Sequence, residues 1–307
     1  ADAIGFNCGI GSVHMKNVLE KCRFPKDVFV LAAPNAGYAE TFSSRAAFLN
    51  SAGYFGDNMA ETAELGVDIV GGDTTSSMTG LAISITAIGY AKEEDIAYRS
   101  GAKETDLICV SGNLGAAYMG LQILEREKSV YNQQVKEATQ QAQRNGSNVE
   151  EAIAQIPQPD FAGKEYLLER QMKPEARKDI VEKLRLANVK ITSMIDISDG
   201  LSSELMHICE QSQCGCRIYE ERIPLDYQTA VTAEEFNLNV STCALNGGED
   251  YELLFTVPLT ANEIVSAIED VKVIGYITKP ELGKALICRD GSEFELKAQG
   301  WNHMTTE

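Results

Sequence analysis

The spacing of apolar residues predicts a chain in which strands alternate with helices. Short apolar runs typical of buried strands cover residues 3–8, 28–33, 67–72, 81–89, 189–197, 216–219, 253–257, 271–277 and 284–288. Apolar residues at helical spacing predict helices over residues 11–21, 54–65, 113–127, 166–171, 176–187, 201–208, 232–237 and 261–268. Residues 128–157 are polar and rich in glutamine, and 131–145 fit an extended, exposed helix. This order predicts the α/β fold class, with helices layered on sheets.

The composition fits a folded chain that handles small molecules. Of 307 residues, 44% are hydrophobic and 23% are charged, so the chain can build a core and is not expected to be disordered. The net charge of −18 repels phosphate backbones, which argues against nucleic acid as a partner but not against nucleotides bound through divalent cations. No signal peptide is visible, and no apolar run approaches the roughly 18 residues of a membrane-spanning helix. We therefore expect neither secretion nor membrane insertion.

The cysteines do not form a recognisable metal or disulfide pattern. The chain has eight, and Cys214 and Cys216 are the only closely spaced pair. Their spacing is shorter than that of the usual zinc pair, and no second pair follows. We expect free thiols in a reducing cytoplasm.

The stretch Asp196-Ile197-Ser198-Asp199-Gly200 lies where an apolar run ends and a helix is predicted to begin. Carboxylates are hard oxygen ligands for Mg²⁺, and the first N–H groups of a helix face an anion, so this stretch suits a metal ion and a phosphate. Ser and Asp are also favoured helix N-caps, and taken alone the stretch is more simply explained that way. Two further stretches favour the metal and phosphate site over the helix N-cap. They are Gly-Gly-Asp-Thr-Thr at 71–75 and Gly-Gly-Glu-Asp-Tyr-Glu at 247–252.

The N-terminal residues resemble part of a known barrel family. Residues 4–9, 34–38 and 64–72 read Ile-Gly-Phe-Asn-Cys-Gly, Pro-Asn-Ala-Gly-Tyr and Glu-Leu-Gly-Val-Asp-Ile-Val-Gly-Gly. They resemble the last strands of a homocysteine S-methyltransferase β/α barrel. That family implies zinc held by three thiolates, one at the position of Cys8 and two directly after the Gly-Gly pair. Asp73 and Thr74 take the latter positions here, so the resemblance implies a fold fragment whose zinc site is lost.

From residue 66 onward the chain resembles a different family. The motifs are Gly-Gly-Asp-Thr-Thr at 71–75, Tyr-Arg-Ser-Gly-Ala-Lys at 98–103, Asp-Leu-Ile-Cys-Val-Ser-Gly-Asn-Leu-Gly-Ala-Ala at 106–117, Asp-Ile-Ser-Asp-Gly-Leu at 196–201 and Gly-Gly-Glu-Asp-Tyr-Glu at 247–252. In this order they resemble the thiamine-monophosphate kinases of the AIR-synthase-like ATP-binding superfamily. The resemblance implies a cytoplasmic homodimer that uses ATP and Mg²⁺ to convert thiamine phosphate to thiamine diphosphate.

The same resemblance implies roles for individual residues. The implied metal ligands are Asp73, Asp196 and Asp199; the implied ATP contacts are Gly72, Asp73, Arg99 and Ser198; the implied thiamine contacts are Glu249 and Trp301. These side chains suit the chemistry, because a guanidinium forks onto phosphate oxygens, while a carboxylate and an aromatic ring attract a cationic thiazolium. Each residue also has a structural alternative: Asp73 and Glu249 as turn residues, Arg99 in a surface ion pair and Trp301 in the core.

The two resemblances meet in residues 66–72 and predict three parts. These are a methyltransferase-like fragment at 1–72, a remnant of the kinase N-terminal ATP-binding domain at 73–97 and the kinase AIR-synthase-like C-terminal domain at 98–307. The kinase N-terminal domain normally supplies further metal ligands, which have no counterpart here. Three hypotheses stay open: an active thiamine-monophosphate kinase, a chimeric or truncated chain without activity, and a zinc-dependent homocysteine S-methyltransferase fragment.

Overall fold

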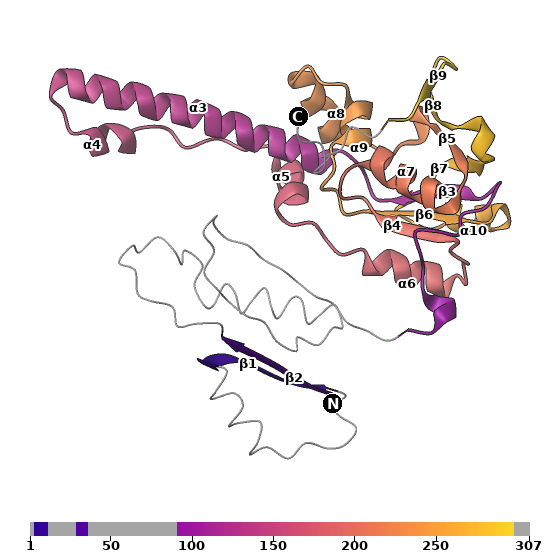
Figure 1. Ribbon diagram of the computed structural model, residues 1–307. Coiled ribbons are helices and arrows are strands. Elements are labelled where there is room, and N and C mark those ends of the chain that lie inside the picture. The colour runs from indigo at the N-terminus through magenta and orange to yellow at the C-terminus, as the bar shows by residue number, and fades with distance from the viewer. Residues whose placement is uncertain (1–2, 12–28, 36–90, 298–307) are drawn as a thin grey trace. The chain divides into compact units, whose positions relative to one another are not determined.

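The computed structural model describes residues 91–297 together with two strands near the N-terminus, and the chain divides into compact units at 1–90 and 91–307 (Figure 1). In the first unit, β1 (Ala3–Gly11) and β2 (Phe29–Asn35) pair in parallel. Both predicted strands are confirmed, and β2 continues through Pro34 and Asn35, two residues beyond the predicted end at residue 33. Parallel pairing is the arrangement that neighbouring strands have in a β/α barrel.

The second unit is built on one seven-stranded sheet. In spatial order its strands are β4 (Ser193–Asp196), β6 (Leu253–Val257), β3 (Leu107–Ser111), β7 (Val271–Thr278), β5 (Gly215–Tyr219), β8 (Lys284–Ile287) and β9 (Glu293–Glu295). Neighbouring strands are antiparallel except β5 and β8, which are parallel. The predicted site residues lie at the carboxyl end of β4 and in the loop that precedes β6.

Both faces of this sheet are buried, because alternate residues of its strands enter different cores. In β3, Ile108 and Val110 pack on one side, while Leu107 and Cys109 pack on the other. Helix α7 (Leu201–Ser212) covers the first face with Leu201, Leu205 and Ile208, which recur at helical spacing. Helices α6 (Lys178–Leu186) and α10 (Asn262–Ser266) cover the second face. Strand alternation and helical periodicity thus meet in one mixed α/β layer structure.

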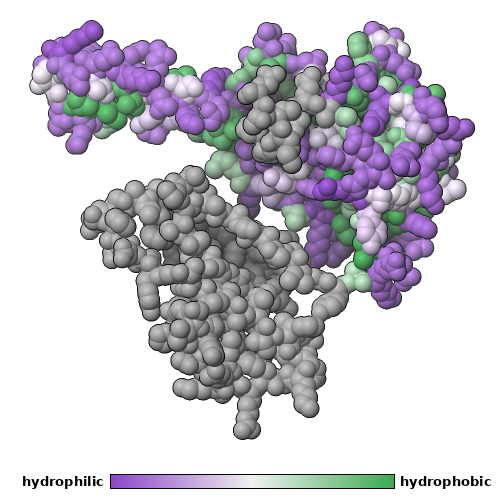
Figure 2. Space-filling view, viewed as in Figure 1, coloured by the Kyte–Doolittle hydropathy of each residue, from purple (hydrophilic) through white to green (hydrophobic). Residues whose placement is uncertain are grey.

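A third core joins helices α3 (Ala116–Asn145), α5 (Glu165–Met172), α8 (Tyr227–Glu235) and α9 (Val240–Asn246). The helices predicted at 113–127 and 131–145 form the single helix α3, since residues 128–130 contain neither Gly nor Pro. Beyond Ile123, α3 leaves this core and projects with α4 (Val149–Ala154) beside it (Figure 1). We call residues 116–154 the helical arm, whose surface is largely hydrophilic (Figure 2). Short 3-10 helices complete the unit: η1 (Glu93–Asp95), η2 (Glu220–Arg222), η3 (Leu259–Ala261) and η4 (Pro280–Leu282).

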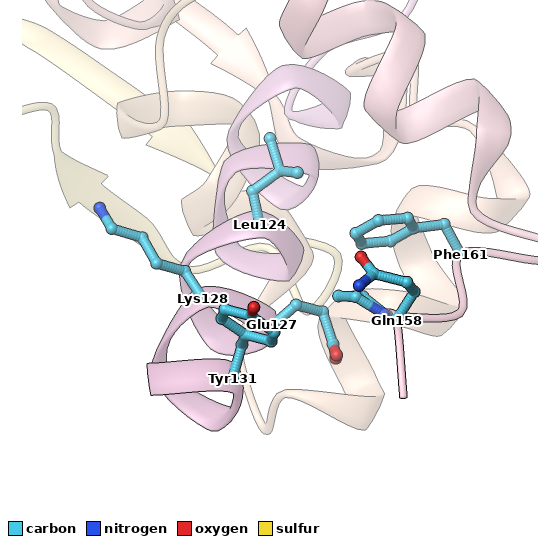
Figure 3. Close-up of a pocket in the computed structure, with 7 residues that line it drawn as sticks. Leu124, Glu127, Lys128, Tyr131, Gln158 and Phe161 are labelled. Atoms are coloured by element: carbon cyan, nitrogen blue, oxygen red, sulfur yellow. The ribbon is translucent and has the colours of Figure 1, made fainter. Parts of the chain in front are cut away.

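A shallow pocket lies between α3 and the segment that returns from α4 (Figure 3). Its lining residues are Leu124, Glu127, Lys128, Tyr131, Gln158, Pro159 and Phe161. None of the predicted site residues lines this pocket. Among the helices that the structure describes, none has both the length and the apolar character required to cross a membrane.

Candidate functional site

The first half of the candidate site is the carboxyl end of β4. Asp196 ends the strand and is exposed, as is Asp199, whereas Ile195 and Ile197 are buried beneath them. Strand β4 pairs with β6, with Asp196 opposite Leu253. Burial of the two isoleucines therefore fixes the backbone so that both carboxylates face outward.

The helix that follows does not use these side chains as caps. Gly200 is the N-cap of α7, and in this described stretch no side chain caps the helix. Instead, the backbone N–H of Asp199 donates to Oε1 of Glu204, at 3.0 Å. The N-cap interpretation of Asp196, Ser198 and Asp199 is therefore wrong, and an acidic residue inside the helix satisfies the backbone in their place.

Glu204 is a residue that sequence reasoning missed. It is buried, and its Oε2 has no hydrogen-bond partner among the described residues. Burial, with the charges of Asp199 and Asp196 adding to it, raises the pKa of Glu204 to about 7. A Glu just inside a helix that follows a Ser-Asp-Gly turn is close to a capping-box pattern, so a sequence signal existed.

This group of oxygens fits a hard cation in its chemistry. The charges of two exposed carboxylates, Asp196 and Asp199, act on the buried Glu204, whose Oε2 has no hydrogen-bond partner among the described residues, and Mg²⁺ prefers such oxygen ligands. Within the described residues, no three acidic, histidine or cysteine side chains converge closely enough to hold a metal ion. The third predicted ligand, Asp73, lies outside the described residues, as do Gly72 and Trp301.

The second half of the candidate site is the loop of residues 248–252, which lies directly against the first. The N–H of Glu249 donates to the carbonyl of Ser198 at 2.7 Å, and the N–H of Tyr251 donates to the carbonyl of Ile197 at 2.8 Å. Gly248 has φ 68°, and a Cβ there would lie 2.4 Å from the Ser198 carbonyl oxygen, so only glycine fits. The two motifs that sequence reasoning singled out separately are thus joined backbone to backbone.

Residues in this loop alternate between exposed and buried. Glu249 and Tyr251 are exposed, whereas Asp250 and Glu252 are each only 1% exposed. Glu249 and Tyr251 adopt left-handed backbone conformations with φ 61° and 51°, which non-glycine residues rarely do. The hydroxyl of Tyr251 donates to Oε2 of Glu249 at 3.0 Å.

The buried Asp250 connects the loop to the start of α3. Its carboxylate accepts hydrogen bonds from the N–H groups of Gly115, at 2.7 Å, and Ala117, at 3.4 Å. A negative charge at a helix N-terminus is favourable because the free N–H groups and the helix dipole are positive there. Asp250 is therefore a structural cap, supplied from far along the chain.

The buried Glu252 is the centre of an ion-pair cluster. Its carboxylate contacts Arg170 at 3.0 Å and Arg177 at 2.6 Å, and it accepts a hydrogen bond from the Ser111 hydroxyl. Arg170 also donates to the backbone carbonyl of Asp250, at 3.1 Å. The two arginines thus stabilise the loop through its buried residues, and the sequence analysis gave no role to either.

We expect the Asp250→Asn variant to change how stability depends on pH. Burial raises the pKa of Asp250 from 3.8 to about 6, against the opposing effect of its backbone donors and Arg170. The folded chain then holds a proton between pH ~4 and ~6 that the unfolded chain releases, so this group's stabilising contribution is lost as pH rises through that window. The free energy of unfolding of the wild type should fall across it by up to about 3 kcal/mol relative to Asp250→Asn.

Urea unfolding at pH 4, 5, 6 and 7 measures this difference. The exposed Asp95→Asn variant is the matched control and should follow the wild type. Parallel pH curves for the wild type and Asp250→Asn would show that Asp250 has the same pKa in the folded and unfolded chain.

Arg99 lies near the other end of β4. The carbonyl of the preceding residue, Tyr98, accepts a hydrogen bond from the Met194 N–H at 2.8 Å, so this segment extends the sheet edge beside β4. Arg99 is exposed and lies beside the beginning of the strand, whereas Asp196 ends it. The structure therefore brings together Asp196, Ser198, Asp199 and Glu249, whereas Arg99 lies at the opposite end of β4.

Comparison with known proteins agrees with this arrangement of motifs. Residues 141–287 match the family model described as AIR synthase related protein, C-terminal domain. A thiamine-monophosphate kinase of Buchnera aphidicola subsp. Schizaphis graminum is 30% identical over 243 residues, which cover 77% of this chain and 64% of that protein. The thiamine-monophosphate kinase of Bacillus subtilis is 28% identical over 254 residues, which cover 80% of this chain and 68% of that protein.

A solved structure of thiamine monophosphate kinase from Aquifex aeolicus is 27% identical, with a TM-score of 0.46 over 65% of this chain and 54% of that one. The chain spans 64% of the length of the Buchnera protein, which is less than two thirds. It is similar to the thiamine-monophosphate kinases over these regions, and residues 141–287 of its second unit match the AIR synthase related C-terminal domain.

Proposed function

We propose that this chain is a kinase that transfers a phosphoryl group from ATP to thiamine phosphate, forming thiamine diphosphate. The observation that carries the proposal is the direct backbone pairing of the Ser198 turn with the Glu249 loop, at 2.7 Å, in a chain similar to thiamine-monophosphate kinases. This pairing gives one surface with outward carboxylates for a metal-bound nucleotide and a neighbouring carboxylate for a cationic acceptor.

The proposed roles follow the chemistry of each side chain. Asp196 and Asp199, with Asp73, would hold Mg²⁺, which when bound neutralises charge on the transferring phosphoryl group. Ser198, Arg99, Gly72 and Asp73 would contact ATP, and Glu249 and Trp301 would bind the thiamine moiety.

The proposed reaction is a direct displacement. An oxygen of the thiamine phosphate attacks the γ-phosphorus of ATP, a new P–O bond forms, and the bond from that phosphorus to the bridging oxygen breaks, so that ADP leaves. In this scheme Ser198 and Arg99 orient the nucleotide phosphates, and Glu249 orients the acceptor by its cationic ring. Catalysis then rests on positioning and on charge, with no covalent enzyme intermediate.

The test is product formation by the purified chain. It is incubated with ATP, MgCl₂ and thiamine monophosphate, and thiamine diphosphate is quantified by chromatography after oxidation to its fluorescent thiochrome derivative. We expect product that depends on all three additions and disappears with excess EDTA. Absence of product under these conditions would overturn the proposal and favour a chimeric or truncated chain without activity.

Further parts of the proposal concern compartment, assembly and the N-terminal residues. The six cysteines of the described region are free thiols, which persist in a reducing compartment, and we propose the cytoplasm. A homodimer is the assembly that the family resemblance implies. The interpretation of residues 1–72 as a methyltransferase-barrel fragment with a lost zinc site stays a prediction, supported by the parallel pairing of β1 and β2.

A further inference from the structure

The exposed tyrosine of the 248–252 loop has no role in the proposed function so far. Tyr251 is 37% exposed, so part of its surface is accessible to a ligand. Its two neighbours in the loop, Asp250 and Glu252, are buried, and their bonds to Gly115 and Arg177 anchor the loop. The loop is therefore fixed in a way that displays Tyr251 next to Glu249.

The backbone around this pair is held in an unusual conformation. Glu249 and Tyr251 both have positive φ, 61° and 51°, and their N–H groups bond to Ser198 and Ile197. Left-handed backbone at non-glycine residues is energetically costly and tends to occur at functional sites. Two such residues, separated only by Asp250 and both exposed, indicate that their side-chain directions matter.

The surroundings of the Tyr251 hydroxyl are acidic. It donates to Glu249 Oε2 at 3.0 Å, and burial together with the charges of Glu249, Asp196 and Asp199 raises its pKa. The hydroxyl therefore stays protonated and remains a donor at neutral pH. It is bonded to the carboxylate proposed to bind the acceptor and lies within electrostatic range of the two carboxylates proposed to bind the metal.

We propose that Tyr251 is a positioning residue that determines acceptor specificity, by holding the Glu249 carboxylate in the orientation that receives a cationic heteroaromatic ring. This inference rests on the proposed function, because it assigns the acceptor to Glu249. The hydrogen bond leaves the second oxygen of Glu249 for the ligand and keeps the carboxylate apart from the metal-binding carboxylates. The acidic surface is thereby divided into a cation-binding part and a metal-binding part.

Removing the Tyr251 hydroxyl alone tests the inference. In Tyr251→Phe we expect KM for thiamine monophosphate to rise about 5- to 10-fold, the value of one typical hydrogen bond, while kcat and KM for ATP change less than about twofold. The matched control is Tyr227→Phe, whose tyrosine is 80% exposed on α8 and should have wild-type constants.

A double-mutant cycle with Glu249→Gln separates positioning from a general effect on the fold. If Tyr251 acts through the Glu249 charge, Tyr251→Phe should weaken thiamine monophosphate binding far less in the Glu249→Gln background than in the wild type. Isothermal titration of thiamine monophosphate onto the full chain with Mg²⁺, without ATP, gives these affinities independently of turnover.

The outcomes distinguish this inference from the proposed function. If the wild type and Tyr251→Phe bind thiamine monophosphate equally well, the role of Tyr251 is overturned and the kinase proposal stays intact. Additive effects in the cycle, or an equal rise in KM for ATP, also overturn it. A wild type that binds thiamine monophosphate but yields no thiamine diphosphate overturns the kinase proposal, and the titrations still decide the role of Tyr251.

Discussion

The Glu252→Ala variant is expected to lose about 3–5 kcal/mol of stability, the usual consequence of removing one partner from a buried ion pair. The side chains of Glu252, Arg177 and Arg170 are only 2%, 11% and 15% exposed. Without the carboxylate, Arg170 loses its ion pair with Glu252, and Arg177 keeps only its pairs with the more exposed Asp179 and Asp270. Surface ion pairs contribute far less, because water screens them.

Denaturant unfolding of the full chain, followed by far-UV circular dichroism, measures the loss. The control is Glu263→Ala, an exposed glutamate on α10, which should stay within about 0.5 kcal/mol of the wild type. A Glu252→Ala midpoint equal to that of the control would show that the cluster does not support the fold. The Gly112→Ala variant probes the same contact sterically, since a Cβ there would lie 2.2 Å from Glu252 Oε1.

The Asp196→Asn variant is expected to lose thiamine diphosphate formation by about 100-fold or more, a loss typical of removing a positioned electrostatic group. The amide keeps the size of the side chain but removes the negative charge that a hard cation requires. Stability should change little, because Asp196 is exposed and does not cap α7. We expect Asp199→Asn to behave in the same way.

Initial rates over a range of MgCl₂ concentrations, with saturating ATP and thiamine monophosphate, provide the measurement. Asp95→Asn, an exposed aspartate in η1, should retain wild-type rates. Full turnover by Asp196→Asn would remove this residue from the proposed metal site and would leave the β4 carboxylate without a function.

Much of the second unit was predictable because its local patterns agree with its packing. The apolar run at 253–257 is strand β6 over the same residues, buried on both faces. The periodic leucines after Gly200 form α7. The pairing of Asp196 with Glu249 across one site followed from family resemblance, and the backbone bonds between their loops are consistent with it.

The buried charges were not predictable from the sequence. In the loop at 248–252 three acidic residues stand within four positions, and nothing local indicates which face inward. That depends on left-handed backbone at Glu249 and Tyr251 and on arginines elsewhere, Arg177 lying 75 residues before Glu252. Gly72, Asp73 and Trp301 lie outside the described residues, and their roles stay predictions.

The length of the helical arm means that a small rotation at its base displaces its far end by a larger distance. Helix α3 has 30 residues, about 45 Å at 1.5 Å per residue, and only its first turns enter the core. Its near end is held by Asp250, the residue between Glu249 and Tyr251. A rotation of about 5° at that end moves the far tip by about 4 Å over this length. A small movement of the 248–252 loop would therefore give a larger displacement near Asn145, which a spectroscopic label there can measure.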